Sequence, residues 1–332
     1  MNIVLCYPVE EHHREQIAAA MPEANVIDAG QEGIAKELFN ADIYCGHAKV
    51  PVDWAGVVEQ GRLKWIQSSA AGMDHCLVPE VVGSDIEVCS ASGVLSDQVA
   101  EHTIGLLTGW CRNMPSFYRA QQKKEYIRLP TRDLTRTTVG ILGLGGVGRR
   151  LAQLLAPFGV RILAVDQFPV EKPEEVEELW PVDRLEEMLA AVDFLVLCLP
   201  LNEITRATVD ASFLAKVKQG AVLANMARGQ LVIHEDLIDS LHSGHLAGAV
   251  LDVADPEPLP PESPLWEMAN VIITPHVAGQ GAWRIDNMTN LFCRNLRRRQ
   301  SGRPLINRLS DKKLGFPIRG EGTPLWGGVA DD

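Results

Sequence analysis

The segment Thr138-Val-Gly-Ile-Leu-Gly-Leu-Gly-Gly-Val-Gly-Arg-Arg-Leu-Ala-Gln-Leu-Leu155 carries the strongest indication of this chain's architecture. An apolar run, residues 139–142, leads into glycines spaced G-x-G-x-x-G, and a segment with helical periodicity follows. Gly143 permits a tight turn, Gly145 lets the backbone approach a pyrophosphate, and Gly148 lets helix and strand pack closely. The anion would lie at the helix N-terminus. The predicted cofactor-binding residues of this loop are Gly143, Gly145, Gly146, Val147 and Gly148.

A carboxylate follows at the distance that a dinucleotide site requires. Asp166 lies eighteen positions after Gly148, at the end of the apolar run 162–165. A carboxylate there accepts hydrogen bonds from a ribose 2′-hydroxyl and repels a 2′-phosphate. The next residues, Gln167 and Phe168, supply no cation. The sequence therefore predicts NAD as the cofactor in preference to NADP. The alternative is a glycine turn followed by a solvent-facing aspartate.

Apolar runs alternate with helical segments along most of the chain, which is typical of parallel sheets covered on both faces. The expected strands are 3–6, 43–45, 65–67, 139–142, 162–165, 194–199, 222–225, 249–253 and 271–273, and the expected helices include 10–20 and 98–112. We therefore predict an α/β protein with two Rossmann-like or flavodoxin-like domains. The tail after Asn307, rich in Gly and Pro, is interpreted as an arm.

Composition excludes several classes of protein. The 332 residues carry a formal net charge of −12, which disfavours a nucleic-acid partner. No apolar run is long enough to cross a bilayer, and the N-terminus does not resemble a signal peptide. Seven scattered cysteines without a C-x-x-C pair favour reduced thiols. We expect a soluble cytoplasmic protein and predict no metal site.

Three polar motifs follow three predicted strands, at the sheet edge where ligands of such folds bind. Arg228 follows 222–225, Glu257 lies in a Pro-rich loop after 249–253, and His276 follows 271–273 behind Pro275. Each residue alone could be an ordinary surface or loop residue. Together they suit hydride transfer, because the cofactor holds the hydride and the protein must orient a carbonyl and supply a proton. His276 would donate that proton, Glu257 would hold its ring, and Arg228 would bind a carboxylate.

These motifs resemble those of the NAD-dependent D-isomer-specific 2-hydroxyacid dehydrogenases. The matching runs are G-L-G-G-V-G, N-M-A-R-G, L-D-V-A-D-P-E-P-L-P and S-P-L-W-E-M-A-N-V-I-I-T-P-H-V-A-G, and the match extends to about Asn307. The resemblance implies a substrate domain of residues 1–101 and 282–310, a nucleotide domain of 102–281 and an arm of 311–332. It also implies an active site in the cleft between the domains and a homodimer formed through the nucleotide domains.

The resemblance further implies the roles of individual residues. The catalytic residues would be Arg228, Glu257 and His276, of which Arg228 and His276 also bind substrate. The run S-S-A-A-G-M-D matches the family's substrate loop, with the backbone of Ala71 and Gly72 on the substrate carboxylate. The further cofactor contacts implied, with Asp252 near the nicotinamide carboxamide, are Pro200, Thr205, Ala227 and Asp252.

The chain departs from the family pattern at two places. Cys198-Leu199-Pro200 replaces the frequent H-x-P, which we expect to alter cofactor contacts alone. Trp283 and Arg284 could shape the substrate pocket, reach a partner's site or pack the returning helix. The sequence thus favours an oxidoreductase acting on NAD(H) and a small 2-oxo or D-2-hydroxy acid such as glyoxylate or hydroxypyruvate. The alternatives are an NAD-sensing corepressor on the same scaffold and a formate dehydrogenase, which carries glutamine where this chain has Glu257.

Overall fold

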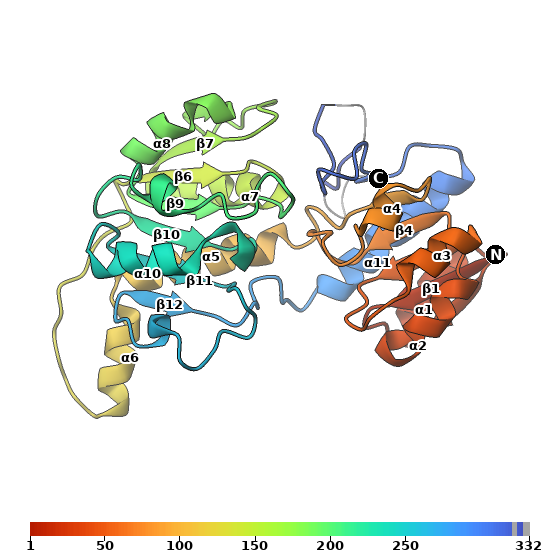
Figure 1. Ribbon diagram of the computed structural model, residues 1–332, viewed down its shortest axis with the longest axis horizontal. Coiled ribbons are helices and arrows are strands. Elements are labelled where there is room, and N and C mark those ends of the chain that lie inside the picture. Colours follow the sequence, from red (N-terminus) through yellow and green to blue (C-terminus); the bar gives the residue numbers. More distant parts are fainter. Residues whose placement is uncertain (321–323, 328–332) are drawn as a thin grey trace. The chain divides into compact units, whose positions relative to one another are not determined.

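The structure is a computed structural model, and it describes residues 1–320 and 324–327. The chain forms two compact units: unit 1 contains Met1–Leu95 and Gly281–Asp332, and unit 2 contains Ser96–Gln280. Each unit is built around one parallel sheet with helices packed against it (Figure 1). Mixed α/β architecture with two parallel sheets is what the sequence predicted.

Unit 1 has a five-stranded sheet in the order β2-β1-β3-β4-β5. Its strands are β1 (Asn2–Cys6), β2 (Asn25–Asp28), β3 (Ile43–Gly46), β4 (Trp65–Ser68) and β5 (Glu87–Cys89). Its helices are α1 (Glu11–Ala20), α2 (Gly30–Glu37), α3 (Trp54–Gln60), α4 (Pro79–Val82) and α11 (Arg284–Gln300), with the 3₁₀ turn η1 (Leu38–Asn40). One face of the sheet packs on α1 and α11, and the other packs on α2, α3 and α4.

Unit 2 has a seven-stranded sheet in the order β12-β11-β10-β9-β6-β7-β8, with every neighbouring pair parallel. Its strands are β6 (Thr138–Leu142), β7 (Arg161–Val165), β8 (Glu178–Trp180), β9 (Phe194–Leu197), β10 (Val222–Asn225), β11 (Gly248–Leu251) and β12 (Val271–Ile273). Because the chain proceeds from β6 through β7 and β8 and then crosses to β9, the order reverses at β6. Ligands of open α/β sheets bind at such a switch point, beyond the carboxyl ends of the strands.

The helices of unit 2 cover both faces of this sheet. They are α5 (Ser96–Cys111), α6 (Met114–Gln122), α7 (Gly146–Leu155), α8 (Leu185–Ala191), α9 (Ala211–Leu214) and α10 (His234–His242), with 3₁₀ turns η2 (Ala156–Phe158), η3 (Val182–Arg184), η4 (Gly229–Leu231) and η5 (Pro264–Trp266). α5 and α7 share one apolar cluster with the sheet, and α8, α9 and α10 share another. Continuous burial of β6, β7 and β9 explains their unbroken apolar sequences.

Two predicted strands were too long. Residues 194–199 end as a strand at Leu197, and residues 249–253 end at Leu251. In both places the chain leaves the sheet to form a loop that carries candidate site residues. The short strands β2, β5 and β8, each of three or four residues, had no sequence prediction.

The described part of the tail after Asn307 contacts unit 1. The Lys312 ammonium donates hydrogen bonds to the carbonyls of Val81 (2.8 Å), Ser84 and Ile86 (3.2 Å). The Trp326 amide donates to Asn307 Oδ1 at 3.0 Å. These contacts join Lys312 to the end of α4 and the segment before β5, and Trp326 to Asn307.

All seven cysteines are free, and six of them are buried. None of the helices in the described part of the chain has the length and apolar character that a bilayer crossing requires.

Candidate active site

The glycine loop after β6 has the backbone that its sequence implied. Gly143 has φ +97°, and a Cβ there would lie 2.8 Å from the Cys198 carbonyl oxygen. A Cβ on Gly148 would lie 2.2 Å from the Gly143 carbonyl oxygen, so α7 can approach β6 because residue 148 lacks a side chain. Gly145 is different, since nothing lies within 4 Å of its Cβ position. That open space at the start of α7 fits a phosphate group held by backbone amides.

Asp166 is tied to this loop by both carboxylate oxygens. Oδ2 accepts from the Leu144 amide at 2.6 Å, and Oδ1 accepts from the Phe168 amide at 2.8 Å. The carboxylate therefore joins the glycine loop to the turn after β7. Each oxygen keeps a lone pair, which suits the ribose hydroxyls of a dinucleotide.

Arg149 is a cation near this turn that the sequence neighbours of Asp166 did not reveal. Its guanidinium donates to the carbonyls of Leu144 (3.1 Å), Val170 (2.7 Å) and Glu171 (2.7 Å). The expectation that no cation accompanies the turn after β7 was drawn from Gln167 and Phe168 alone. The structure brings in an arginine from α7, and its donors hold the 170–171 backbone in place.

His276 and Glu257, nineteen residues apart, are in direct contact. His276 Nδ1 lies 2.9 Å from Glu257 Oε2, and Glu257 Oε1 accepts from the Ala254 amide at 3.0 Å. One carboxylate oxygen thus fixes the glutamate to its own loop while the other holds the imidazole. The histidine side chain is 46% exposed, so its Nε2 edge can meet a ligand. This pairing is the geometry expected of an acid–base histidine with an orienting carboxylate.

The backbone at His276 is strained. Its φ is +55°, a left-handed conformation that few residues other than glycine adopt. The His276 amide donates to the carbonyls of Asp252 (2.7 Å) and Thr274 (3.1 Å). The turn after β12 is therefore set by neighbouring backbone, and Pro275 lies inside it.

Asp252 is buried, 2% exposed, directly after β11. Its oxygens accept from the Thr274 hydroxyl (2.6 Å), the Val277 amide (2.9 Å) and the Ala278 amide (2.9 Å). The residue implied to lie near the nicotinamide carboxamide thus also holds the segment that carries His276.

Arg228 follows β10, the strand beside β11. Its guanidinium donates to the Ala227 carbonyl at 2.8 Å, and its own carbonyl accepts from the Asn225 side chain at 2.9 Å. A Cβ on the next residue, Gly229, would lie 1.8 Å from the Ala254 carbonyl oxygen. The missing side chain lets the Arg228 loop lie directly against the loop that anchors Glu257.

The remaining cofactor candidates of unit 2 lie in two tight loops. The Thr205 hydroxyl donates to the Pro200 carbonyl at 2.6 Å, which closes the loop after β9. The Ala227 amide donates to Asn225 Oδ1 at 3.1 Å. Burial raises the pKa of the nearby Cys198 thiol to about 12. The residue that replaces the family's frequent histidine is therefore a neutral thiol at physiological pH.

The candidate substrate loop belongs to unit 1, after β4. The Ser68 hydroxyl lies 2.8 Å from His75 Nε2 and accepts from the Ala70 amide at 3.0 Å. Within residues 1–320 and 324–327, no acceptor is recorded for the amides of Ala71 and Gly72, and Ala71 is exposed. Two amides without an internal acceptor in a small-residue turn suit an anion.

Trp283 and Arg284 lie at the start of α11. Trp283 is the N-cap residue and is 69% exposed, while burial lowers the pKa of Arg284. Neither observation assigns them to a pocket.

A second polar cluster in unit 1 has ligand-like spacing. His13 Nε2 and His12 Nε2 lie 3.0 and 3.5 Å from Asp286 Oδ1. However, His13 Nδ1 accepts from the Glu10 amide at 3.1 Å, so a neutral His13 carries its proton on Nε2. A metal-bound histidine has the opposite arrangement, with its second nitrogen donating. The cluster therefore ties α1 to α11 by hydrogen bonds.

A parallel sheet with a glycine loop at its switch point, together with a histidine–carboxylate pair at neighbouring strand ends, defines a nucleotide-dependent dehydrogenase. The family model described as D-isomer specific 2-hydroxyacid dehydrogenase, NAD binding domain, matches residues 104–278. The chain belongs to this family.

Individual relatives and solved structures of this family also match the chain. The chain is 34% identical over 255 residues to glyoxylate reductase/hydroxypyruvate reductase of Homo sapiens, with 75% of this chain and 77% of that protein covered. It is 37% identical over 286 residues to an uncharacterized protein in the proB 3′ region of Corynebacterium melassecola, with 83% and 91% covered.

Among solved structures, the D-isomer specific 2-hydroxyacid dehydrogenase from Xanthobacter autotrophicus in complex with NADPH and MES gives a TM-score of 0.80 at 29% identity, covering 95% of this chain and 99% of that one. The NADPH-dependent glyoxylate/hydroxypyruvate reductase from Sinorhizobium meliloti, in complex with NADP and sulfate, gives 0.80 at 27% identity with the same coverage.

Proposed function

We propose that this chain reduces a small 2-oxo acid of the glyoxylate or hydroxypyruvate kind to the D-2-hydroxy acid. The cofactor, when bound, supplies the hydride for the carbonyl carbon. The observation that carries the proposal is the 2.9 Å contact between His276 Nδ1 and Glu257 Oε2 on adjacent strand-end loops of the nucleotide-binding unit. The relative named glyoxylate reductase/hydroxypyruvate reductase supports the substrate class.

Each residue of the trio has a distinct task in this mechanism. Protonated His276 donates from Nε2 to the carbonyl oxygen as negative charge develops there, while Glu257 holds the ring through Nδ1. Arg228 binds the substrate carboxylate through its planar guanidinium. For the amides of Ala71 and Gly72 in unit 1 we propose carboxylate binding as well, because both lack an internal acceptor in the described residues.

We propose NAD(H) as the preferred cofactor, which would distinguish this chain from the two solved structures that hold NADPH or NADP. The support is the Asp166 carboxylate at the end of β7, joined to the Leu144 amide of the glycine loop. A carboxylate in this place opposes a 2′-phosphate.

Purified protein should oxidise NADH in the presence of glyoxylate, hydroxypyruvate or a related 2-oxo acid, measured as loss of nicotinamide absorbance. The specificity constant with NADH should exceed that with NADPH. Asp166→Ala should lower this NADH-to-NADPH ratio, because the repulsion of a 2′-phosphate is removed. NADH binding without turnover of any acid in the panel would refute the enzyme proposal and favour a binding module. An unchanged cofactor ratio in Asp166→Ala would remove Asp166 from the cofactor site.

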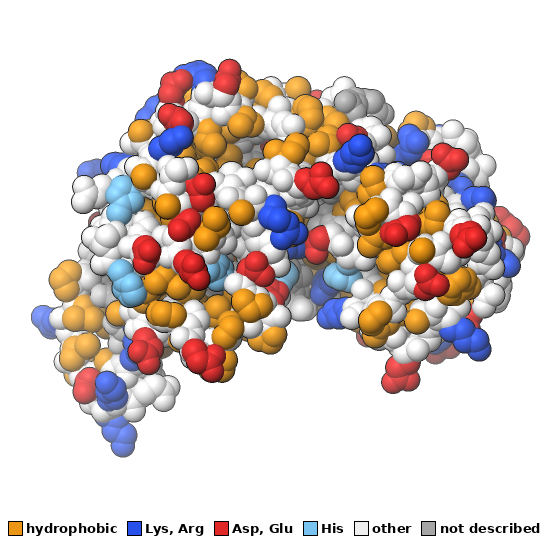
Figure 2. Space-filling model, viewed as in Figure 1, with side chains coloured by type: hydrophobic (Ala, Val, Ile, Leu, Met, Phe, Trp, Pro, Cys, Tyr) orange, Lys and Arg blue, Asp and Glu red, His pale blue; other side chains and the backbone are white. Residues whose placement is uncertain are grey.

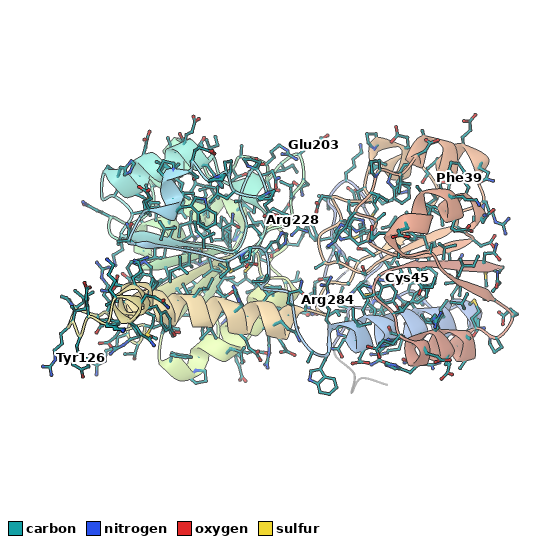
Figure 3. The ribbon with its side chains drawn as sticks, turned by 90° about the horizontal axis from the view of Figure 1, so that it is seen from below. Phe39, Cys45, Tyr126, Glu203, Arg228 and Arg284 are labelled. Atoms are coloured by element: carbon teal, nitrogen blue, oxygen red, sulfur yellow. The ribbon has the colours of Figure 1, made fainter. Side chains whose placement is uncertain are left out.

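We also propose that the chain forms a homodimer through unit 2. A groove of about 620 Å³ lies between α5 and α6, lined by Gly105, Leu106, Gly109, Arg112, Met114 and Tyr118. α6 and the loop after it extend from the end of the unit (Figure 1), and exposed apolar side chains lie among charged ones over α6 (Figure 2). Tyr118 is 57% exposed and Tyr126 is 98% exposed. Tyr126 lies at the opposite end of unit 2 from Arg228 (Figure 3). A second copy that binds at the Tyr126 end therefore leaves the Arg228 end open.

Gly109 offers a matched test of the dimer. Nothing lies within 4 Å of its Cβ position, so one subunit has room for a larger residue there. Gly109→Ala should stay dimeric and gain up to about 1 kcal/mol in stability from helix propensity. Gly109→Arg should be monomeric at micromolar concentration in sedimentation velocity, because the side chain fills the groove. A monomeric parent protein, or a dimer unaffected by arginine, would contradict the proposal.

A further inference from the structure

The buried carboxylate of Asp252 also has a contact on the α5 side, with a residue outside the catalytic trio. Besides its bonds to the 274–278 segment, its Oδ1 lies 3.5 Å from Nε2 of His102, an ion-pair distance. His102 lies on α5, which packs beside β11 and β12. The same Nε2 lies 2.9 Å from the Thr274 hydroxyl oxygen. Three residues from three elements of unit 2 thus form one hydrogen-bonded chain: His102, Thr274 and Asp252.

Elementary chemistry fixes which group donates and which accepts in the hydrogen bonds between His102, Thr274 and Asp252. A carboxylate can only accept, so the Thr274 hydroxyl donates its hydrogen to Asp252 Oδ1 across 2.6 Å. The Thr274 oxygen must then accept from His102, which therefore carries a proton on Nε2. Without that donor, the Thr274 hydroxyl would be held by its bond to Asp252 alone. The imidazole of α5 thus supplies the second hydrogen bond that fixes the position of this hydroxyl at the end of β12.

This series of hydrogen bonds ends at the backbone segment that carries His276. With Oδ1 occupied by the Thr274 hydroxyl and the Val277 amide, and Oδ2 by the Ala278 amide, the Asp252 carboxylate has one defined orientation. The amides that it binds directly follow His276, whose φ of +55° needs outside support. A small displacement of this turn would move the imidazole away from Glu257. Misplacing a catalytic group in this way lowers the rate more than it lowers cofactor affinity.

We propose that His102 is a positioning residue for the reaction. By donating Nε2–H to Thr274, it locks the hydroxyl and Asp252 into the arrangement that holds the 276–278 turn and presents His276 to the substrate. The inference rests on the proposed function, because it takes His276 as the acid–base group. His102 itself contacts neither Glu257 nor His276 in the described hydrogen bonds.

The test compares His102→Leu, which removes the donor, with His102→Gln, whose amide can still donate to Thr274. His102→Leu should lower kcat roughly tenfold, as expected for loss of one hydrogen bond in a coupled network, with the Kd for NADH within about twofold of the parent. His102→Gln should recover most of the loss. Thr274→Val should lower kcat about as much as His102→Leu. The double variant His102→Leu/Thr274→Val should have a kcat no lower than the slower single variant, because both substitutions break the same series of hydrogen bonds.

A matched control separates positioning from general stability. His245 is half-buried in the same unit, and its Nε2 lies within 3.0 Å of two backbone carbonyls. His245→Leu should lower the melting temperature and leave kcat unchanged. If His102→Leu has the kcat of the parent, or if His102→Gln is as slow as His102→Leu, the positioning role of His102 is refuted.

Hydrogen exchange of the Val277 and Ala278 amides gives a readout that does not require turnover. Exchange should accelerate at least roughly tenfold in His102→Leu and stay near the parent rate in His102→Gln and His245→Leu, because protection reports local opening of the turn. Unchanged exchange in His102→Leu would overturn the inference even if activity fell. A parent protein that turns over no 2-oxo acid would refute the proposed function, while amide exchange would still decide whether His102 holds the turn.

Discussion

Replacing His276 should lower kcat for 2-oxo acid reduction by roughly 10²- to 10⁴-fold, the usual contribution of a positioned acid–base group. Asparagine is the sharpest replacement, because it tolerates the left-handed φ of +55° that this position adopts. Alanine adds backbone strain to the loss of the imidazole. His276→Asn should therefore keep the melting temperature and the Kd for NADH near the values of the parent while losing turnover. Stopped-flow absorbance with saturating NADH and substrate measures the loss.

Glu257→Gln is the companion variant. Its Oε1 can still accept from the Ala254 amide, as Glu257 does at 3.0 Å, but the charge beside His276 Nδ1 is lost. We expect a smaller decrease in kcat, roughly ten- to a hundredfold, because the ring stays in place without its anionic partner. A His276→Asn protein with more than about a tenth of the parent kcat would show that another group donates the proton.

Much of the architecture could be predicted because its physical cause is local. The run 139–148 combines a buried strand with two glycines that close neighbours require. A Cβ on Gly143 would lie 2.8 Å from the Cys198 carbonyl oxygen, and a Cβ on Gly148 would lie 2.2 Å from the Gly143 carbonyl oxygen. The contact between Glu257 and His276 could be anticipated because parallel strands bring their carboxyl ends to one edge. β2, β5 and β8 had no such signal, because each begins or ends with a polar residue and β2 and β8 have exposed positions, so none forms a continuous apolar run.

The residues that sequence reasoning missed act across long separations. His102 and Thr274 are 172 positions apart, and neither lies in a motif whose spacing points to the other. Arg149 contacts the turn after β7 through backbone carbonyls, which leave no trace in side-chain chemistry. The left-handed backbone of His276 was also invisible, because Thr274-Pro275-His276 indicated rigidity without indicating the sign of φ. Such features depend on how loops from different strands meet.

Gly229 is the position where one added methyl group should do the greatest structural damage to the site. A Cβ there would lie 1.8 Å from the Ala254 carbonyl oxygen, 2.0 Å from the Ala254 carbonyl carbon and 2.6 Å from the Asp255 amide nitrogen. All three are backbone atoms, so no side-chain rotation can relieve the overlap. The 254–255 backbone must move away from the Arg228 loop, and the Ala254 amide that anchors Glu257 moves with it.

We therefore expect Gly229→Ala to lose about 1–3 kcal/mol of unfolding free energy, measured by urea denaturation. kcat should fall by roughly 10², because a shift near 1 Å at a catalytic group has that effect. Gly33→Ala in α2 is the control: its Cβ would meet Ala29 Cβ at an ordinary 3.7 Å. It should raise stability by up to about 1 kcal/mol and leave kcat unchanged. If Gly229→Ala were as stable and as fast as the parent, the close approach of the Arg228 and Glu257 loops would not exist in solution, and the two residues could not serve one substrate.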